Sequence, residues 1–121
     1  MDTNAKKQEM RQRTKDFAKT VIRLFTELDR RHEEIRILGR QMIRAGTSVG
    51  ANYREASRAR SDAEFIAKIE LCVQEADETQ FWLELLEESC EVPDSKTAPI
   101  WREADELISI FITMAKNTKN K

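Results

Sequence analysis

The stretch RAGTSVGANYREASRAR, residues 44–60, holds two of the three glycines in the chain, and the third, Gly39, lies just upstream. Apolar residues recur at helical spacing from Ile35 to Ala56, which predicts one helix running straight through the glycines. Small residues share one side of it: Gly39, Gly46, Gly50 and Ser57. Because each costs about 0.5–1 kcal/mol relative to alanine inside a helix, we expect another helix to approach closely there. A phosphate-binding loop is the alternative, but the G-x-x-x-x-G-K-[ST] spacing is absent.

Three further amphipathic segments accompany this one. The chain has 121 residues, 40% apolar and 36% charged, with few glycines and prolines, a composition typical of long helices in one compact domain. Ser61 and Glu64 form an S-x-x-E capping box, and the prolines flank the start of the last segment. The predicted helices span about 14–31, 34–60, 62–91 and 98–117. We expect an all-α bundle over 13–117, between a flexible arm at 1–12 and a frayed tail at 118–121.

The composition also indicates which classes of site and location to expect. The N-terminal residues lack the apolar core of a secretory signal, and no stretch approaches about twenty apolar residues, so a cytoplasmic protein without a membrane span is expected. Cys72 and Cys90 would lie about 27 Å apart along one helix, too far to form a disulfide. Two thiols and one histidine fall short of the four ligands of structural zinc, so no metal or cofactor is expected.

Charge is segregated along the chain. Residues 1–60 contain 15 basic and 8 acidic residues, a net charge of +7, while residues 61–95 contain 1 and 11, a net charge of −10. Five arginines project from one side of the predicted helix 34–60: Arg36, Arg40, Arg44, Arg54 and Arg58. This row either pairs with the acidic helix 62–91 or forms a surface for a polyanion such as RNA. The net charge of −1 for the whole chain weighs against a dedicated nucleic-acid binder.

The segment 62–91 is apolar on two sides. One stripe suits the core of a bundle, while Leu71, Trp82 and Leu85 lie on a different side, with Phe81 at its margin. One bundle core cannot bury both sides. We therefore expect a homo-oligomer whose interface contains these four residues, unless neighbouring helices or the 92–99 loop cover Trp82.

Spaced polar identities between Leu38 and Ser89 form a signature. They are Gly39, Arg40 and Gln41 (G-[KR]-Q); Arg44, Thr47, Ser48, Val49, Ala51 and Asn52 (R-x-x-T-S-[IV]-x-A-N); Arg54, Glu55, Ala56 and Ser61; Phe65 and Lys68; and Glu75, Ala76, Glu78, Thr79, Trp82 and Leu83 (E-A-x-E-T-x-x-W-L). This signature resembles that of the bacterial 23S rRNA-intervening-sequence protein family, also called the four helix bundle protein family.

The resemblance implies a fold, an assembly and a class of partner. The fold is an up-and-down, left-handed, antiparallel four-helix bundle, and the assembly is a ring, typically a homopentamer. The activity of the family is generally unassigned. A related bundle, the accessory variability determinant of diversity-generating retroelements, presents a basic ring surface to nucleic acid and to its reverse transcriptase. RNA or an RNA-processing protein is the partner that this relationship implies.

Polar residues of the signature also flank the predicted core: Ser48, Asn52, Glu55, Glu75 and Thr79. We expect hydrogen bonds between the first three and the last two to fix helix register or a subunit contact. A catalytic pair of Glu55 and Glu75 is the alternative, which would need a pocket or a bound metal. Di-metal bundles use Glu-x-x-His motifs, and the single histidine, His32, lies in none.

Three functions of different class follow from these observations. The preferred one is a non-enzymatic oligomeric scaffold that binds RNA or an RNA-processing protein through the basic face. A protein-only adaptor without nucleic-acid binding is the second. A hydrolase or metal enzyme is the third and is not expected.

Overall fold

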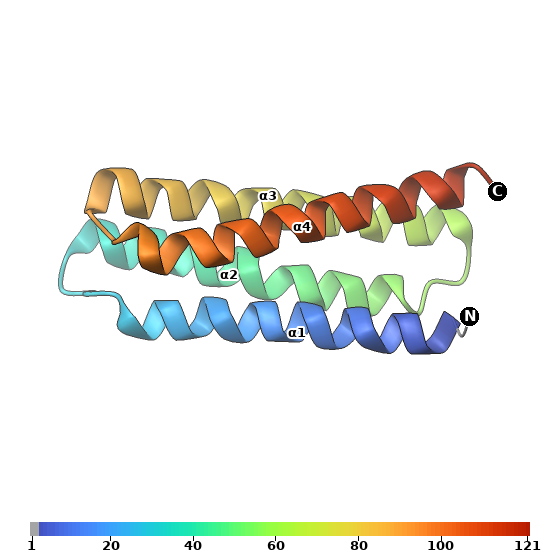
Figure 1. The fold of residues 1–121 in the computed structure, drawn as a ribbon, viewed down its shortest axis with the longest axis horizontal. Coiled ribbons are helices and arrows are strands. Elements are labelled where there is room, and N and C mark those ends of the chain that lie inside the picture. The colour runs from blue at the N-terminus through green and yellow to red at the C-terminus, as the bar shows by residue number, and fades with distance from the viewer. Residues whose placement is uncertain (1–2) are drawn as a thin grey trace.

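The structure is a computed structural model that describes residues 3–121. Four helices follow one another along the chain: α1 (Thr3–Glu27), α2 (Glu33–Ala56), α3 (Asp62–Cys90) and α4 (Asp94–Lys119). They run alternately up and down, so both chain ends lie at the same end of the bundle as the α2–α3 loop (Figure 1). No strand occurs in the described part of the chain. The predicted all-α, antiparallel four-helix bundle is confirmed.

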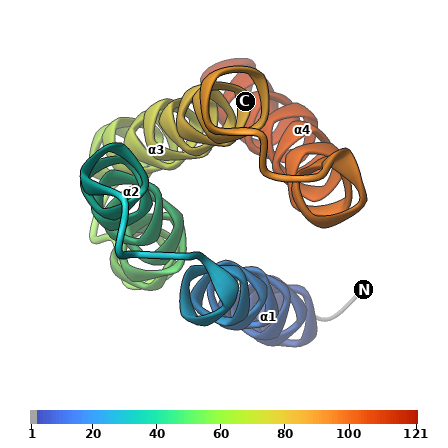
Figure 2. The ribbon, with the colours of Figure 1, turned by 90° about the vertical axis from the view of Figure 1, so that its left-hand side faces the viewer.

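Each helix packs on its neighbours in the chain. Seen from the end, the helices form an arc in which α1 contacts α2, α2 contacts α3 and α3 contacts α4, while α1 and α4 touch over a smaller area (Figure 2). Ion pairs bridge this fourth seam: Arg13 binds Glu103 at 2.8 Å and Glu106 at 3.3 Å, and Lys96 binds Glu27 at 2.6 Å. Polar contacts therefore contribute to closing the bundle between its first and last helices.

A continuous apolar core fills the space between the helices. Its largest fully buried apolar side chains are Phe111, Met42, Ile69, Leu83, Leu86, Leu107, Val21, Val49 and Cys72. The rings of Tyr53 and Phe111 stack with centroids 6.0 Å apart. Burial raises the pKa of the Cys72 thiol to about 12, as expected of a core-filling cysteine. Across residues 3–121, no helix combines the length and apolar composition that crossing a membrane requires.

Close approach of α1, and of Leu28 just after it, accounts for Gly46 and Gly39 of α2, as predicted. A Cβ atom at Gly46 would lie 2.8 Å from both Cγ atoms of Val21, and one at Gly39 would lie 2.9 Å from Cδ1 of Leu28. At Gly50 the nearest neighbour is the Thr14 carbonyl oxygen, 3.4 Å away. Glycine thus lets the two backbones pack tightly at the first two positions.

Helix α1 begins at Thr3, which corrects the predicted flexible arm at 1–12 for all of its described residues. Met10 is buried in the core, and Arg11 donates from Nε and Nη2 to Ser57 Oγ at 3.0 and 2.8 Å. The predicted helix begins at about residue 14 because residues 3–13 show little apolar periodicity. Contacts with the rest of the bundle stabilise this part of α1. Residues 1 and 2 of the predicted arm lie outside the described residues.

Other helix ends differ from the predictions by several residues. Helix α1 ends at Glu27 rather than near 31, and α2 ends at Ala56 rather than near 60. Helix α4 begins at Asp94, which places Pro99 in its second turn instead of its first. It continues to Lys119 and so takes in half of the predicted frayed tail at 118–121, where Lys119 binds Glu70 at 3.4 Å.

The predicted capping box is present at the start of α3. The Glu64 amide donates to Ser61 Oγ at 3.1 Å, and the Glu64 carboxylate accepts from the Arg60 amide at 2.9 Å. The return bond thus reaches the residue before the cap instead of the cap itself.

Candidate nucleic-acid interface

Four of the five predicted arginines lie on the outer side of α2, and the fifth, Arg58, lies in the turn just after it. Their spacing along the chain places the arginines on the side opposite the buried side chains of Met42, Val49 and Tyr53. All are exposed except Arg36, which is half-buried. The arginines of the predicted row therefore share one side of the molecule, with Thr47 and Ala51 between Arg44 and Arg54.

Two members of the row are neutralised within the chain. Arg36 pairs with Glu33 on its own helix, and Arg44 reaches across to α3, where it binds Glu78 and, at 3.4 Å, Glu75. The hydrogen bond that Arg44 donates to Glu78 is the main cause that raises the pKa of Arg44. Burial, with repulsion from Glu78, raises the pKa of Glu75 despite the opposing effect of Arg44. Both arginines are therefore paired with carboxylates and do not present free positive charge to a ligand.

The other three arginines remain available to an external anion. Within residues 4–121, no carboxylate forms an ion pair with Arg40, Arg54 or Arg58. Such exposed guanidinium groups can bind phosphates in bidentate fashion. The available positive charge of the row is thus concentrated at three positions, two of them four residues apart at the end of α2 and just beyond it.

Helix α1 adds two cations that the sequence analysis did not assign to the site. Arg11 and Lys15 lie beside Arg54 and Arg58 along a groove of about 370 Å³ between α1 and α2. The i, i+4 spacing of Arg11 and Lys15 is the sequence signal for a shared helix face. The predicted arm at 1–12 places Arg11 outside the predicted helix that contains Lys15. The packing of α1 on α2 therefore turns a row on one helix into a basic surface on two.

The predicted polar network forms differently from the expectation. Ser48 and Thr79 donate to backbone carbonyls of their own helices at 2.7 and 2.8 Å, and Asn52 does the same at 3.0 Å. Short polar side chains inside helices commonly bond to the carbonyl one turn earlier, which removes them from cross-helix bonding.

Two carboxylates of that predicted network instead bind long cationic side chains. Glu75 accepts from Arg44, and Glu55 accepts from Lys68 at 3.2 Å, so both links cross between α2 and α3. Arginine and lysine side chains are long enough to span the distance between the two helices. The serine and threonine hydroxyls and the asparagine amide are too short to do so. The cross-helix register contacts therefore come from ion pairs.

The four residues of the predicted oligomer interface are covered to different degrees. Phe81 is 51% exposed and Leu71 is 38% exposed, while Trp82 and Leu85 are half-buried. Trp82 packs against the core and donates its indole N–H to Glu78 at 3.2 Å. Its own subunit thus covers part of Trp82, and Phe81 and Leu71 are the open apolar positions of α3.

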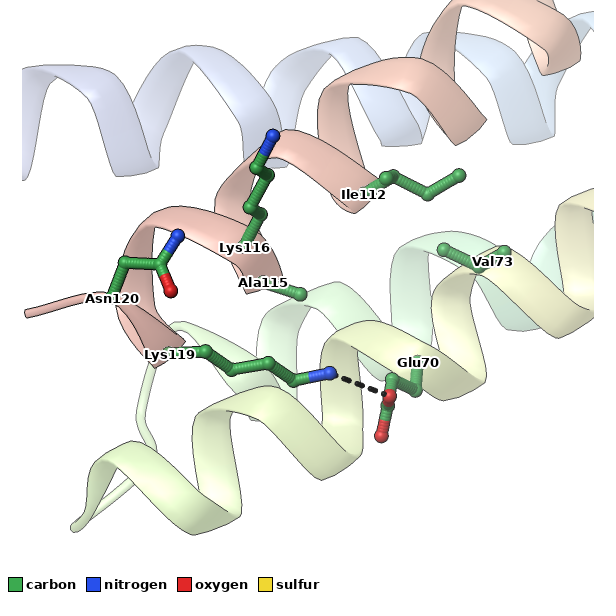
Figure 3. A pocket seen from close by; sticks show the side chains of 7 residues that line it. All are labelled: Glu70, Val73, Ile112, Ala115, Lys116, Lys119 and Asn120. Atoms are coloured by element: carbon green, nitrogen blue, oxygen red, sulfur yellow. Dashed lines mark hydrogen bonds and ion pairs between the residues drawn. The ribbon is translucent and has the colours of Figure 1, made fainter.

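A second hollow, of about 490 Å³, lies between α3 and α4 and has a different character (Figure 3). Val73, Ile112 and Ala115 form an apolar wall, and Lys119 extends toward Glu70 and binds it at 3.4 Å. This ion pair neutralises Lys119 and leaves Lys116 as the other cation of the lining, so the hollow lacks the cluster of available cations that distinguishes the groove between α1 and α2.

Comparisons with known proteins are consistent with this fold. The family model described as 23S rRNA-intervening sequence protein matches residues 6–113. A crystal structure of a protein with unknown function from the S23 ribosomal protein family of Bacteroides thetaiotaomicron VPI-5482 is similar to the chain, with a TM-score of 0.80 and 31% identity. The match covers 88% of this chain and 97% of that chain. No curated protein matches. By the extent of the family match, the chain belongs to the 23S rRNA-intervening sequence protein family.

Proposed function

We propose that this protein is a non-enzymatic cytoplasmic scaffold that assembles with copies of itself and binds RNA through the basic outer face of α2. The observation that carries the proposal is the set of exposed arginines at 40, 54 and 58, which form no ion pair within residues 4–121. An RNA backbone supplies the phosphates that such guanidinium groups bind, with release of counterions.

The separation of charge between the helices supports binding despite the net charge of −1. The excess of +7 lies in residues 1–60, and the excess of −10 lies in residues 61–95, which include α3. A polyanion responds to the local potential of the face it approaches more than to the total charge. The acidic helix would keep RNA on one side of the molecule.

Exposed apolar side chains on α3 support assembly. Phe81 and Leu71 are large, apolar and open to solvent on a helix whose other side fills the core. Contact between copies would remove this apolar surface from water. A ring of five copies, which the family resemblance implies, would repeat the basic face and multiply its contacts with one RNA.

The absence of a catalytic role is part of the proposal. Glu55 and Glu75, the carboxylates considered for acid–base chemistry, bind different cations, Lys68 and Arg44. This arrangement suits contacts between helices, because each carboxylate already has a cationic partner at its own site.

RNA binding can be tested with two triple variants that change the net charge equally. We expect Arg40→Glu, Arg54→Glu and Arg58→Glu together to abolish a salt-sensitive shift of RNA in a native gel, because phosphates would meet carboxylates. The control combines Arg23→Glu, Arg102→Glu and Lys116→Glu, exposed positions on α1 and α4. Circular dichroism verifies the fold of both. Equal loss in the two triples, or RNA binding retained by the first, would refute the assigned face.

A protein-only adaptor is the second candidate, favoured by the apolar exposure of Phe81. It predicts that the native protein retains no RNA at physiological salt and instead co-purifies with a defined protein. Sequencing the nucleic acid and identifying the proteins bound to the same purified sample distinguishes the two functions.

A further inference from the structure

We infer that the groove between α1 and α2, over Gly50, seats the phosphate groups of a single RNA strand. The inference rests on the proposed function and deepens it, because it assigns a defined binding site and the form of RNA that enters it. Five features carry it: the cations that line the groove, the pairing of its one carboxylate with a lysine, the fixed orientation of Arg11, the small residues of its floor and its size.

Cations line the groove from both helices. Arg11 and Lys15 come from α1, Arg54 comes from the last turn of α2, and Arg58 comes from the turn that follows α2. Within residues 4–121, Lys15, Arg54 and Arg58 form no ion pair. Cations on both sides of a groove concentrate the positive potential in the space between them.

The single carboxylate in the groove lining is already balanced. Glu55 binds Lys68 of α3 at 3.2 Å, so its negative charge is compensated from the far side of α2. A phosphate entering the groove would therefore meet four cationic groups and one neutralised acid. This excess distinguishes the groove from the hollow between α3 and α4, where Lys119 is paired with Glu70.

Arg11 is held in place before any ligand arrives. Its Nε and Nη2 atoms donate to the hydroxyl of Ser57 at 3.0 and 2.8 Å, and Ser57 itself is buried. A hydroxyl is neutral, so the contact orients the guanidinium without cancelling its charge. Such preorganisation lowers the entropy that a ligand must overcome on binding.

Small residues line part of the groove, here called its floor. They are Gly50 and Ala51 of α2 and Ala18 of α1, with Thr14 and Thr47 completing the set of short side chains. With no long side chain among them, a phosphate can approach the helices between the cationic walls. Gly50 adds no side chain to the lining, so this part of the groove stays open.

The size of the groove favours a single strand. Its volume of about 370 Å³ is at the low end of the about 300–1,000 Å³ typical of ligand sites, which suits a nucleotide-sized group. Adjacent packed helices have axes about 8–10 Å apart, so a duplex would rest on the rims and leave the floor empty. A flexible single strand can insert its backbone.

Two lysines of α1 allow a test of the site with variants that change the net charge equally. Lys15 lines the groove, while Lys19, one turn along, does not, and both are exposed. We expect Lys15→Gln to weaken binding of a single-stranded oligonucleotide about three- to tenfold and to reduce the slope of log K against log salt by about 0.7. Lys19→Gln should leave the slope unchanged. Equal slopes for the two variants would overturn the assignment of the groove.

A second pair of variants tests the shape of the groove without changing charge. Ala51→Leu places a larger side chain on the floor, and Ala67→Leu makes the same change at an exposed position of α3. We expect only the first to reduce affinity for the single strand, with little effect on binding of a duplex of the same sequence. Undiminished binding by Ala51→Leu would count against entry into the groove.

Separate outcomes identify failure of the inference and failure of the proposed function. If the α2 triple variant loses RNA while Lys15→Gln and Ala51→Leu bind normally, the proposed function stands and the groove assignment falls. If neither RNA form binds, but inorganic pyrophosphate shifts the amide resonances of Gly50 and Ala51, the groove binds free phosphate and both RNA statements are wrong. If no probe shifts these resonances, the phosphate site itself is refuted.

Discussion

Gly46 is the position where helix α2 has least room for a side chain. A Cβ atom there would lie 2.8 Å from the Cγ atoms of Val21, which is fully buried and, being β-branched, has no flexible end to move aside. At Gly50, by contrast, the nearest atom would be 3.4 Å away, an ordinary contact. The two glycines therefore have different reasons for being in the same helix.

These two glycines give opposite predictions for stability. We expect Gly46→Ala to lower the free energy of unfolding by about 1–2 kcal/mol, because overpacking outweighs the gain in helix propensity. Gly50→Ala should raise it by about 0.5–1 kcal/mol, since the propensity gain meets no clash. Urea unfolding followed by circular dichroism measures both. A Gly46→Ala protein as stable as the wild type would show that α1 does not require glycine there.

Helices α1 and α4 meet through a polar seam rather than through extensive packing. The Arg13 guanidinium donates to both oxygens of Glu103, at 2.8 and 2.9 Å, and this hydrogen bonding lowers the pKa of Glu103. A carboxyl group with a lowered pKa in the folded state stabilises the fold above its ordinary pKa. That contribution disappears as the pH falls through the folded-state value.

Arg13→Gln should therefore destabilise the protein in a pH-dependent manner. We expect a loss of about 0.5–1 kcal/mol in the free energy of unfolding at pH 7, because the pair is partly exposed to solvent. The difference from wild type should shrink as the pH is lowered from 5 to about 3, as Glu103 becomes protonated. Urea titrations across this range measure it.

Arg102→Gln is the matched control for this element, because Arg102 is exposed on α4 and forms no ion pair within residues 4–121. It should change stability little at any pH. A wild-type advantage over Arg13→Gln that persists undiminished at pH 3 would contradict the role given to Glu103.

At the scale of the whole molecule, the apolar exposure of α3 is the basis for the proposed assembly. Phe81 and Leu71 are open, whereas Trp82 is partly covered by its own subunit and bonded to Glu78. A change at Trp82 would therefore disturb the subunit as well as a contact between subunits. Phe81 is the better position at which to separate the two effects.

We expect light scattering to find an oligomer at micromolar concentration and Phe81→Glu to convert it to monomers, because a buried, unpaired carboxylate is costly at an interface. Ile112→Glu is the control, since Ile112 is 53% exposed on α4 and lies outside the proposed interface. Circular dichroism confirms that both variants remain folded. A monomeric wild-type protein would refute assembly, and dissociation by Ile112→Glu alone would move the interface to α4.

Local sequence patterns determined the number of helices, their core-facing residues and the order of the arginines along α2. These features repeat every three to four residues or depend on neighbours in the chain, as the bond between Ser61 and Glu64 does. The close approach at Gly46 was also predictable, because glycine inside a helix needs a compensating contact. The signature between Leu38 and Ser89 was sufficient to indicate the family.

Only the tertiary structure decided which charges remain available. Arg44 is neutralised by two carboxylates more than thirty residues away in the sequence. Arg11 and Lys15 of α1 line the same groove as Arg54 of α2. Such contacts depend on the axial rotation and offset of one helix against another, which periodicity within a helix does not specify. For the same reason, the helical start of α1 and the partial cover of Trp82 became evident only once the helices were packed together.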